Sequence, residues 1–118
     1  MKPELTAYLG RCVSVTVDRP LGSRHPRHPD LVYPVNYGFL PGTVSGDGMA
    51  IDVYVVGVNV PADLIECVVI AVVIRADDAE DKLVAAPTGH SYSAAQIAEA
   101  VSFQERYFDS QIIVPRED

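Results

Sequence analysis

Five short segments that are apolar or alternate apolar with polar residues constrain the fold of this chain most strongly. Turn-forming residues follow most of these segments, for example the pair Pro41-Gly42. Short strands separated by such turns at intervals of about a dozen residues are typical of β-barrels and sandwiches. We therefore predict a mainly β (α+β) fold, a closed or partly closed barrel of five strands, at residues 11–17, 33–40, 51–58, 67–75 and 82–86.

One helix is predicted, close to the C-terminal end. Ser93 is a favourable N-cap, and Gln96 three residues later completes a capping box. Ile97, Val101 and Phe108 then follow at helical spacing. We expect an amphipathic helix of about four turns that packs on the barrel. The 118 residues fit one domain, so residues 1–118 are predicted to form a single barrel domain.

The charge and the cysteines restrict the partners and the compartment that we expect. Sixteen acidic and nine basic residues give a net charge of −7, which opposes binding to nucleic acid or to an anionic membrane. Cys12 and Cys67 lie in apolar segments without metal-ligand spacing, so we expect buried free thiols. The first five residues lack the pattern of a signal peptide, and the longest apolar run, 67–74, is too short to span a bilayer. The prediction is a cytoplasmic protein.

Acidic residues on turns between apolar strands are the main chemical signal. Asp47 lies in a glycine-flanked turn, and Asp52 lies inside an apolar strand. Strand alternation places Ile51 and Val53 on one face and Asp52 with Tyr54 on the other. A carboxylate in a half-buried strand is costly unless a cation or hydrogen-bond donors satisfy it. The position of Asp52 therefore indicates a site.

A second acidic cluster follows the most apolar strand and comes directly before Lys82; it comprises Asp77, Asp78, Glu80 and Asp81. Oxygen-rich clusters suit hard cations such as Mg²⁺, which also binds phosphate oxygens. Two such ions could activate a water and neutralise phosphate charge, which is the chemistry that phosphoanhydride hydrolysis requires. Either acidic cluster taken alone is also compatible with an ordinary turn or a solvated loop.

The stretch 19–30 is the most basic part of the chain and is predicted to be a loop because it holds three prolines and a glycine. Arg24, Lys82 and the tyrosines could hold phosphoryl oxygens. His25 and His28 could be ligands, although histidines in a loop of this kind are more often exposed.

Four segments in order resemble the soluble inorganic pyrophosphatases of the first family. Residues 33–39 match its Tyr-Pro-x-Asn-Tyr-Gly segment, and 45–53 match its Asp-Gly-Asp-Pro-x-Asp signature at the same separation. Residues 77–85 are similar to its second acidic segment, and 100–107 to its helix that ends in a substrate tyrosine. The resemblance implies a five-stranded OB-like closed barrel with a C-terminal helix packed on it, Mg²⁺ dependence, hydrolysis of pyrophosphate and, commonly, a homo-oligomer.

The resemblance also implies roles for individual residues. The catalytic residues are Asp52, Lys82 and Tyr37; the substrate-binding residues are Arg24, Tyr37, Lys82 and Tyr107; the metal ligands are Asp47, Asp52, Asp77 and Asp81. Asp18 takes the place of an early glutamate. Alternation along the strand favours Glu80 on the face of Lys82, whereas residue identity favours Asp81, which we assign.

Two positions depart from the family pattern and leave other functions open. Met49 replaces the middle acid of the signature, and Phe108 replaces a second lysine. The alternatives are a protein that binds a phosphorylated ligand without hydrolysing it, and a hydrolase of another diphosphate. An OB-type nucleic-acid module is disfavoured by the acidic charge and by the lack of a stacking array of aromatic residues.

Overall fold

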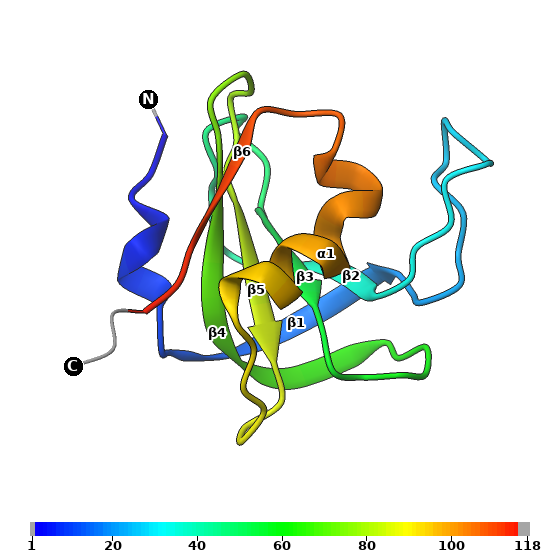
Figure 1. Ribbon diagram of the computed structural model, residues 1–118, viewed down its shortest axis with the longest axis horizontal. Coiled ribbons are helices and arrows are strands. Elements are labelled where there is room, and N and C mark those ends of the chain that lie inside the picture. The colour runs from blue at the N-terminus through cyan, green and yellow to red at the C-terminus, as the bar shows by residue number, and fades with distance from the viewer. Residues whose placement is uncertain (1, 116–118) are drawn as a thin grey trace.

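A computed structural model describes residues 2–115 of the chain (Figure 1). The elements are the short 3₁₀ helix η1 (Leu5–Tyr8), the α-helix α1 (Ala94–Glu105) and the strands β1 (Cys12–Arg19), β2 (Asn36–Leu40), β3 (Ile51–Val55), β4 (Leu64–Arg75), β5 (Lys82–Ala86) and β6 (Ser110–Ile113). All five predicted strands are present.

Five strands close into a barrel in the order β1-β2-β3-β5-β4, because β1 also pairs with β4. The closing pair is antiparallel and joins Cys12–Thr16 to Leu64–Val68. The neighbours β3 and β5 are parallel, and the other pairs are antiparallel. The predicted five-stranded closed barrel is therefore confirmed.

The twelve-residue β4 is long enough to serve two neighbours along one edge. Its first half pairs with β1, and its second half, Val72–Arg75, pairs with β6. The chain after α1 thus adds a sixth strand outside the barrel.

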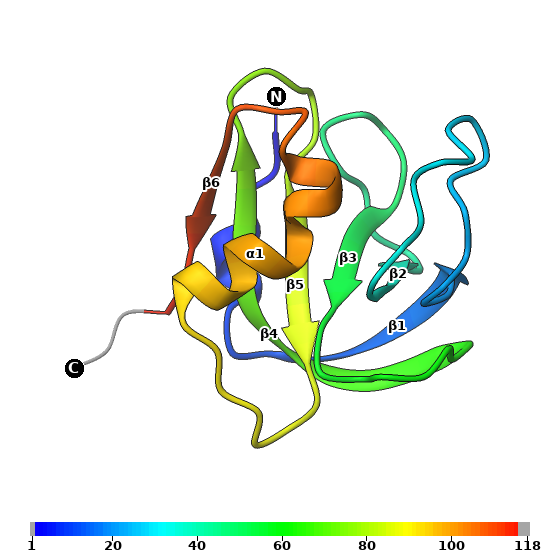
Figure 2. The ribbon, with the colours of Figure 1, turned by 45° about the vertical axis from the view of Figure 1, so that its right-hand side comes forward.

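Two apolar cores lie on opposite faces of the sheet. One fills the barrel and includes Ile51, Val53 and Val55. The other lies between the outer face and α1, and includes Tyr54 and Ile97. The alternation predicted for β3 is thus confirmed, and α1 crosses the outer face of the sheet (Figure 2).

The helix begins as predicted and ends earlier than predicted. Ser93 Oγ accepts a hydrogen bond from the Gln96 amide, and the Gln96 side chain accepts one from the Ser93 amide, so the capping box is present. The α-helix ends at Glu105, and tighter hydrogen bonds then form the turn through Phe108. That turn moves Phe108 off the helix.

A buried polar network fastens the end of α1 to the barrel. Arg75 donates to both carboxylate oxygens of Glu105, at 3.0 and 2.5 Å. Glu105 also accepts from Tyr54 at 2.5 Å and from Ser110 at 2.6 Å. Burial acts to raise the pKa of Glu105, but these hydrogen bonds and the Arg75 charge hold it below its usual value. Gln104 extends the network by donating to Tyr54 at 2.8 Å.

Two further features differ from or add to the sequence predictions. Cys67 is buried as expected, and burial raises the pKa of its thiol to about 11, whereas Cys12 is exposed and not buried. Asn36 is fully buried, where its side chain accepts from the Leu21 amide at 2.9 Å and donates to the Val60 carbonyl at 2.9 Å. Among residues 2–115, no helix has the length and apolar character needed to cross a membrane.

The Arg75–Glu105 pair generates a stability prediction. Replacing Glu105 with Ala leaves a buried guanidinium without its main partner, a change that typically costs about 3–5 kcal/mol. We expect a correspondingly lower unfolding midpoint in urea. Glu99→Ala, on the exposed side of the same helix, is the matched control and should change stability little. Equal midpoints for the two variants would contradict this account of the network.

Candidate active site

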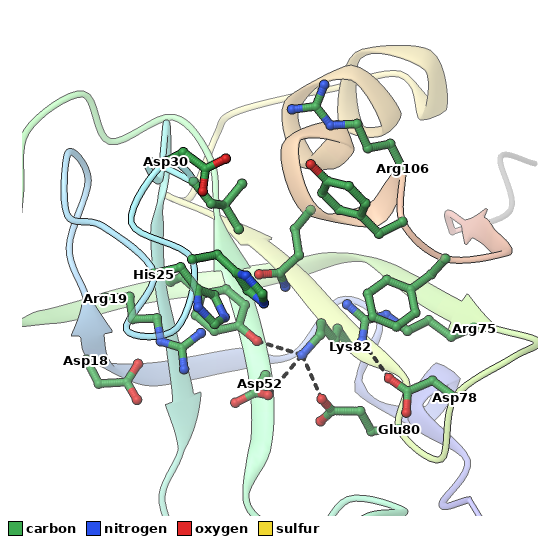
Figure 3. Close-up of a pocket in the computed structure, with 16 residues that line it drawn as sticks. Asp18, Arg19, His25, Asp30, Asp52, Arg75, Asp78, Glu80, Lys82 and Arg106 are labelled. Atoms are coloured by element: carbon green, nitrogen blue, oxygen red, sulfur yellow. Dashed lines mark hydrogen bonds and ion pairs between the residues drawn. The ribbon is translucent and has the colours of Figure 1, made fainter.

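A cavity of about 740 Å³ opens on the outer face of the barrel, beside the end of α1 (Figure 3). Its floor is formed by residues of the sheet and of the β4–β5 turn, among them Tyr37, Asp52, Glu80 and Lys82. One wall comes from residues of the basic stretch between β1 and β2, and the opposite wall from Arg106–Phe108 after the helix.

The basic stretch forms an ordered two-stranded finger. Backbone hydrogen bonds join Gly22 to Tyr33, Tyr33 to Ser23 and His25 to Leu31. Figures 1 and 2 show that the finger projects from the barrel as a narrow loop between β1 and β2. The prediction of a loop was correct, because the segment between β1 and β2 holds no named strand. The segment nevertheless has a defined shape and faces the cavity.

The Lys82 ammonium occupies the centre of the floor. It donates to the Tyr37 hydroxyl at 2.6 Å, to Asp52 Oδ2 at 2.9 Å and to Glu80 Oε1 at 2.9 Å, and its side chain is 3% exposed. The strand registers explain the convergence. Tyr37 on β2 pairs with Tyr54 on β3, and Val53 on β3 pairs with Leu83, the residue after Lys82 on β5. A buried ammonium is tolerated when it is paired and its protons are accepted in this way.

The groups around Lys82 have shifted proton affinities. Burial raises the pKa of Glu80, although the Lys82 charge beside it acts in the opposite direction. Burial, together with the charges of Asp52 and Glu80, raises the pKa of Tyr37 well above its usual value. Tyr37 is therefore a neutral phenol at physiological pH. Its oxygen accepts from Lys82, so its proton is available to a ligand or a carboxylate.

Arg19 supplies a second cation that reasoning from the sequence did not assign. Its guanidinium donates to the Tyr33 hydroxyl at 2.6 Å and lies 5.6 Å from the centre of the Tyr37 ring. Burial acts to lower its pKa, but the hydrogen bond to Tyr33 and nearby charges leave it raised, so it stays charged. Neighbouring Asp18 also lines the cavity, and burial raises its pKa despite the opposing charge of Arg19.

A register shift between Val17 and Arg19 explains why this arginine faces the cavity. Regular alternation would give Arg19 the inward direction of Val15 and Val17, which lie in the barrel core. The bulge inserts a change of face at the end of β1, and Arg19 lines the outer cavity instead.

Several residues assigned from the sequence do not line the cavity. Arg24 is exposed and donates to the Pro29 carbonyl at 2.7 Å, which closes the finger. Asp47 accepts from the Met49 amide at 2.9 Å within its own turn, and Met49 is 68% exposed. Asp77 accepts from the Asp109 amide at 3.0 Å.

The last two acids before Lys82 face different sides of the chain. Asp81 is buried on the other side of the chain, where it accepts from Lys2 at 2.7 Å and from the Arg75 amide at 3.0 Å. Glu80 shares the face of Lys82, as the two-residue period of the strand requires. Of the assigned residues, the cavity brings together Tyr37, Asp52, Lys82 and Tyr107, and it adds Glu80.

The donor set at the floor fits a hydrated hard cation better than an all-protein cage. Within residues 2–115, no three His, Cys, Asp or Glu side chains form a group that could hold a metal. Glu80 Oε2, however, is buried and has no hydrogen-bond partner, and half-buried Asp52 lies beside the same ammonium. Mg²⁺ is commonly bound through one or two carboxylates, with water and phosphate oxygens completing its shell.

The chain is similar to known pyrophosphatases in sequence. A family model described as inorganic pyrophosphatase matches residues 14–111. The inorganic pyrophosphatase of Rickettsia prowazekii is 43% identical over 60 residues, which are 48% of this chain and 35% of that protein. The inorganic pyrophosphatase of Aeropyrum pernix is 42% identical over 77 residues, 62% of this chain and 40% of that protein. The matches thus span well under half the length of these curated relatives.

The fold is similar to solved pyrophosphatase structures. The inorganic pyrophosphatase of Neisseria gonorrhoeae superposes with a TM-score of 0.65 at 22% identity, covering 88% of this chain and 81% of that one. That of Ehrlichia chaffeensis gives a TM-score of 0.65 at 18% identity, with 89% and 88% covered. At these identities the likeness concerns the barrel and its helix.

The contacts of Lys82 predict how Glu80 will titrate. Lys82→Met removes the charge that opposes the effect of burial, so the pKa of Glu80 should rise further above its usual value. A carbon-detected NMR titration of the side-chain carboxyl groups measures this change. Lys2→Met is the control, because Lys2 pairs with Asp81 and not with Glu80. An unchanged Glu80 pKa in the Lys82 variant would contradict the described geometry.

Proposed function

Because the chain belongs to the inorganic pyrophosphatase family, we propose that it hydrolyses inorganic pyrophosphate to two phosphate ions. The observation that carries the proposal is the convergence of Lys82, Asp52, Glu80 and Tyr37 on one cavity floor. A phosphoanhydride needs positive charge on its oxygens and an oriented water, and this floor offers both cationic and anionic groups.

The substrate oxygens bind Lys82 and Arg19 in this proposal. Lys82 exchanges part of its contact with the carboxylates for contact with phosphoryl oxygens, and the Arg19 guanidinium offers a planar pair of donors. Tyr37 remains protonated and donates its hydroxyl hydrogen to an oxygen of the substrate. Tyr107, at the rim of the cavity, is the further substrate contact that the sequence predicted.

We propose Mg²⁺ as the cofactor, held through Asp52 and Glu80, with Asp47 close enough for its charge to act on Glu80. The buried, unpartnered oxygen of Glu80 supports this assignment, and Glu80 replaces Asp81 in it. When bound, the metal supplies positive charge against the phosphoryl oxygens and makes water a better nucleophile. Asp52 and Glu80 would also orient that water by accepting hydrogen bonds from it.

A second candidate function is binding of a phosphorylated ligand without turnover. Met49 favours it, because this exposed residue replaces the middle acid of the family signature, which could act as a base. A positioned base is commonly worth about 10²–10⁴-fold in rate.

We propose a cytoplasmic location, which the exposed free thiol of Cys12 supports. A homo-oligomer stays a prediction.

Phosphate release from pyrophosphate in the presence of Mg²⁺ tests the proposed activity. Lys82→Met should lower the rate by about 10²–10³-fold, the usual effect of removing one group that stabilises charge in the transition state. Asp52→Asn should also lower it strongly. Lys2→Met, which removes a lysine outside the cavity, should keep the rate of the parent protein. A parent protein that releases no more phosphate than Asp52→Asn would refute hydrolysis.

Arg19 and Arg24 provide a matched pair for the substrate-binding arginine. Arg19→Gln should reduce kcat/KM by about 10–100-fold, the effect expected for lost hydrogen bonds to a charged group. Arg24→Gln should leave kcat/KM close to that of the parent, because Arg24 contacts only the Pro29 carbonyl among the side-chain hydrogen bonds of the described residues. A larger loss of kcat/KM for Arg24→Gln than for Arg19→Gln would restore the assignment of Arg24 made from the sequence.

A further inference from the structure

The cavity is larger than an inorganic diphosphate requires. Its volume of about 740 Å³ lies within the range of roughly 300–1,000 Å³ that is typical of pockets for organic ligands. The groups proposed to hold the phosphates, Lys82 with Asp52 and Glu80, lie together at the floor. Much of the cavity therefore extends beyond the phosphate site.

The walls of the cavity combine charged side chains, such as Asp30 and Arg106, with apolar surface. Leu31 from the finger and Phe108 from the turn after α1 supply apolar surface on its two walls. His25 adds a planar ring, which stacks on Tyr33 at a centroid distance of 6.4 Å and an interplanar angle of 10°. Its Nδ1 accepts from the Arg27 amide, and burial together with nearby cations lowers its pKa, so the ring is mostly neutral. Planar and apolar groups of this kind suit a flat organic group.

We propose, on the basis of the proposed hydrolase function, that the preferred substrate is a nucleoside diphosphate, with its diphosphate on Lys82 and its base between Leu31 and Phe108. Water forms a bond to the terminal phosphorus, and the bond from that phosphorus to the bridging oxygen breaks. The products are a nucleoside monophosphate, phosphate and the proton released from water. The finger and the turn after α1 thus determine specificity, and the floor carries the chemistry.

Two non-hydrolysable probes separate this inference from the hydrolase proposal. Calorimetry with Mg²⁺ compares α,β-methylene-ADP, which has a base, with methylenediphosphonate, which has only the phosphorus groups. We expect α,β-methylene-ADP to bind about ten-fold or more tightly than methylenediphosphonate, as one stacked base provides. Methylenediphosphonate that binds equally well or better overturns the inference and leaves the pyrophosphatase proposal standing. Binding of neither probe overturns both.

Two wall variants and one control identify the place of the base. Leu31→Ser and Phe108→Ser should each weaken α,β-methylene-ADP by about five-fold, and Leu31→Ser should leave methylenediphosphonate unchanged. The guanidinium carbon of Arg75 lies 3.7 Å from the centre of the Phe108 ring, so Phe108 also contributes to packing. If Phe108→Ser does not fold, the result for Leu31→Ser tests the place of the base. Val44→Ser, at a residue that is 64% exposed and outside the cavity, is the control and should change neither affinity. Equal loss with both probes for Leu31→Ser would overturn the assignment.

Discussion

The buried pair of Arg75 and Glu105 connects the barrel to α1 and β6, which lie outside it. Arg75 ends β4, pairs with Ser110 of β6 and holds Glu105 at the last turn of α1. It also donates to Asp78 at 2.7 Å and lies against Phe108, so the same guanidinium fixes the β4–β5 turn and one wall of the cavity. A charge in such a place is stable only if its partners stay in position. Stability of the helix and shape of the site therefore depend on a single interaction.

The floor of the cavity likewise depends on a buried cation whose partners hold it in place. Lys82 is buried among three acceptors, and its positive charge offsets the repulsion between the two carboxylates that it contacts. Without that ammonium, Asp52 and Glu80 would repel one another and would need protons or other cations. The arrangement keeps acidic groups close together before any ligand arrives. This pre-organisation supports the proposed chemistry at the floor.

Much of the fold was predictable because local rules determine it. Alternation identified the two faces of β3, and the Ser93–Gln96 capping box located the start of α1. Features that depend on tertiary pairing were not predictable. The bulge that turns Arg19 outward is visible only in the register of β1 against β2, and the tail became β6 because the long β4 had a free edge. The two-residue period of a strand favoured Glu80 on the face of Lys82, whereas residue identity favoured Asp81.

The pairing of β1 with β4 has a consequence for how the chain folds. Contact between Val13 and Cys67 joins segments that are far apart in sequence, and β5, which lies between β3 and β4, comes later still. A chain that emerges from the ribosome cannot complete this ring until residue 86 is available. Non-local closure of this kind slows folding, since the entropy of a long loop is lost before its contacts form. During synthesis the first strand must wait, with one edge unprotected, for most of the protein to be made.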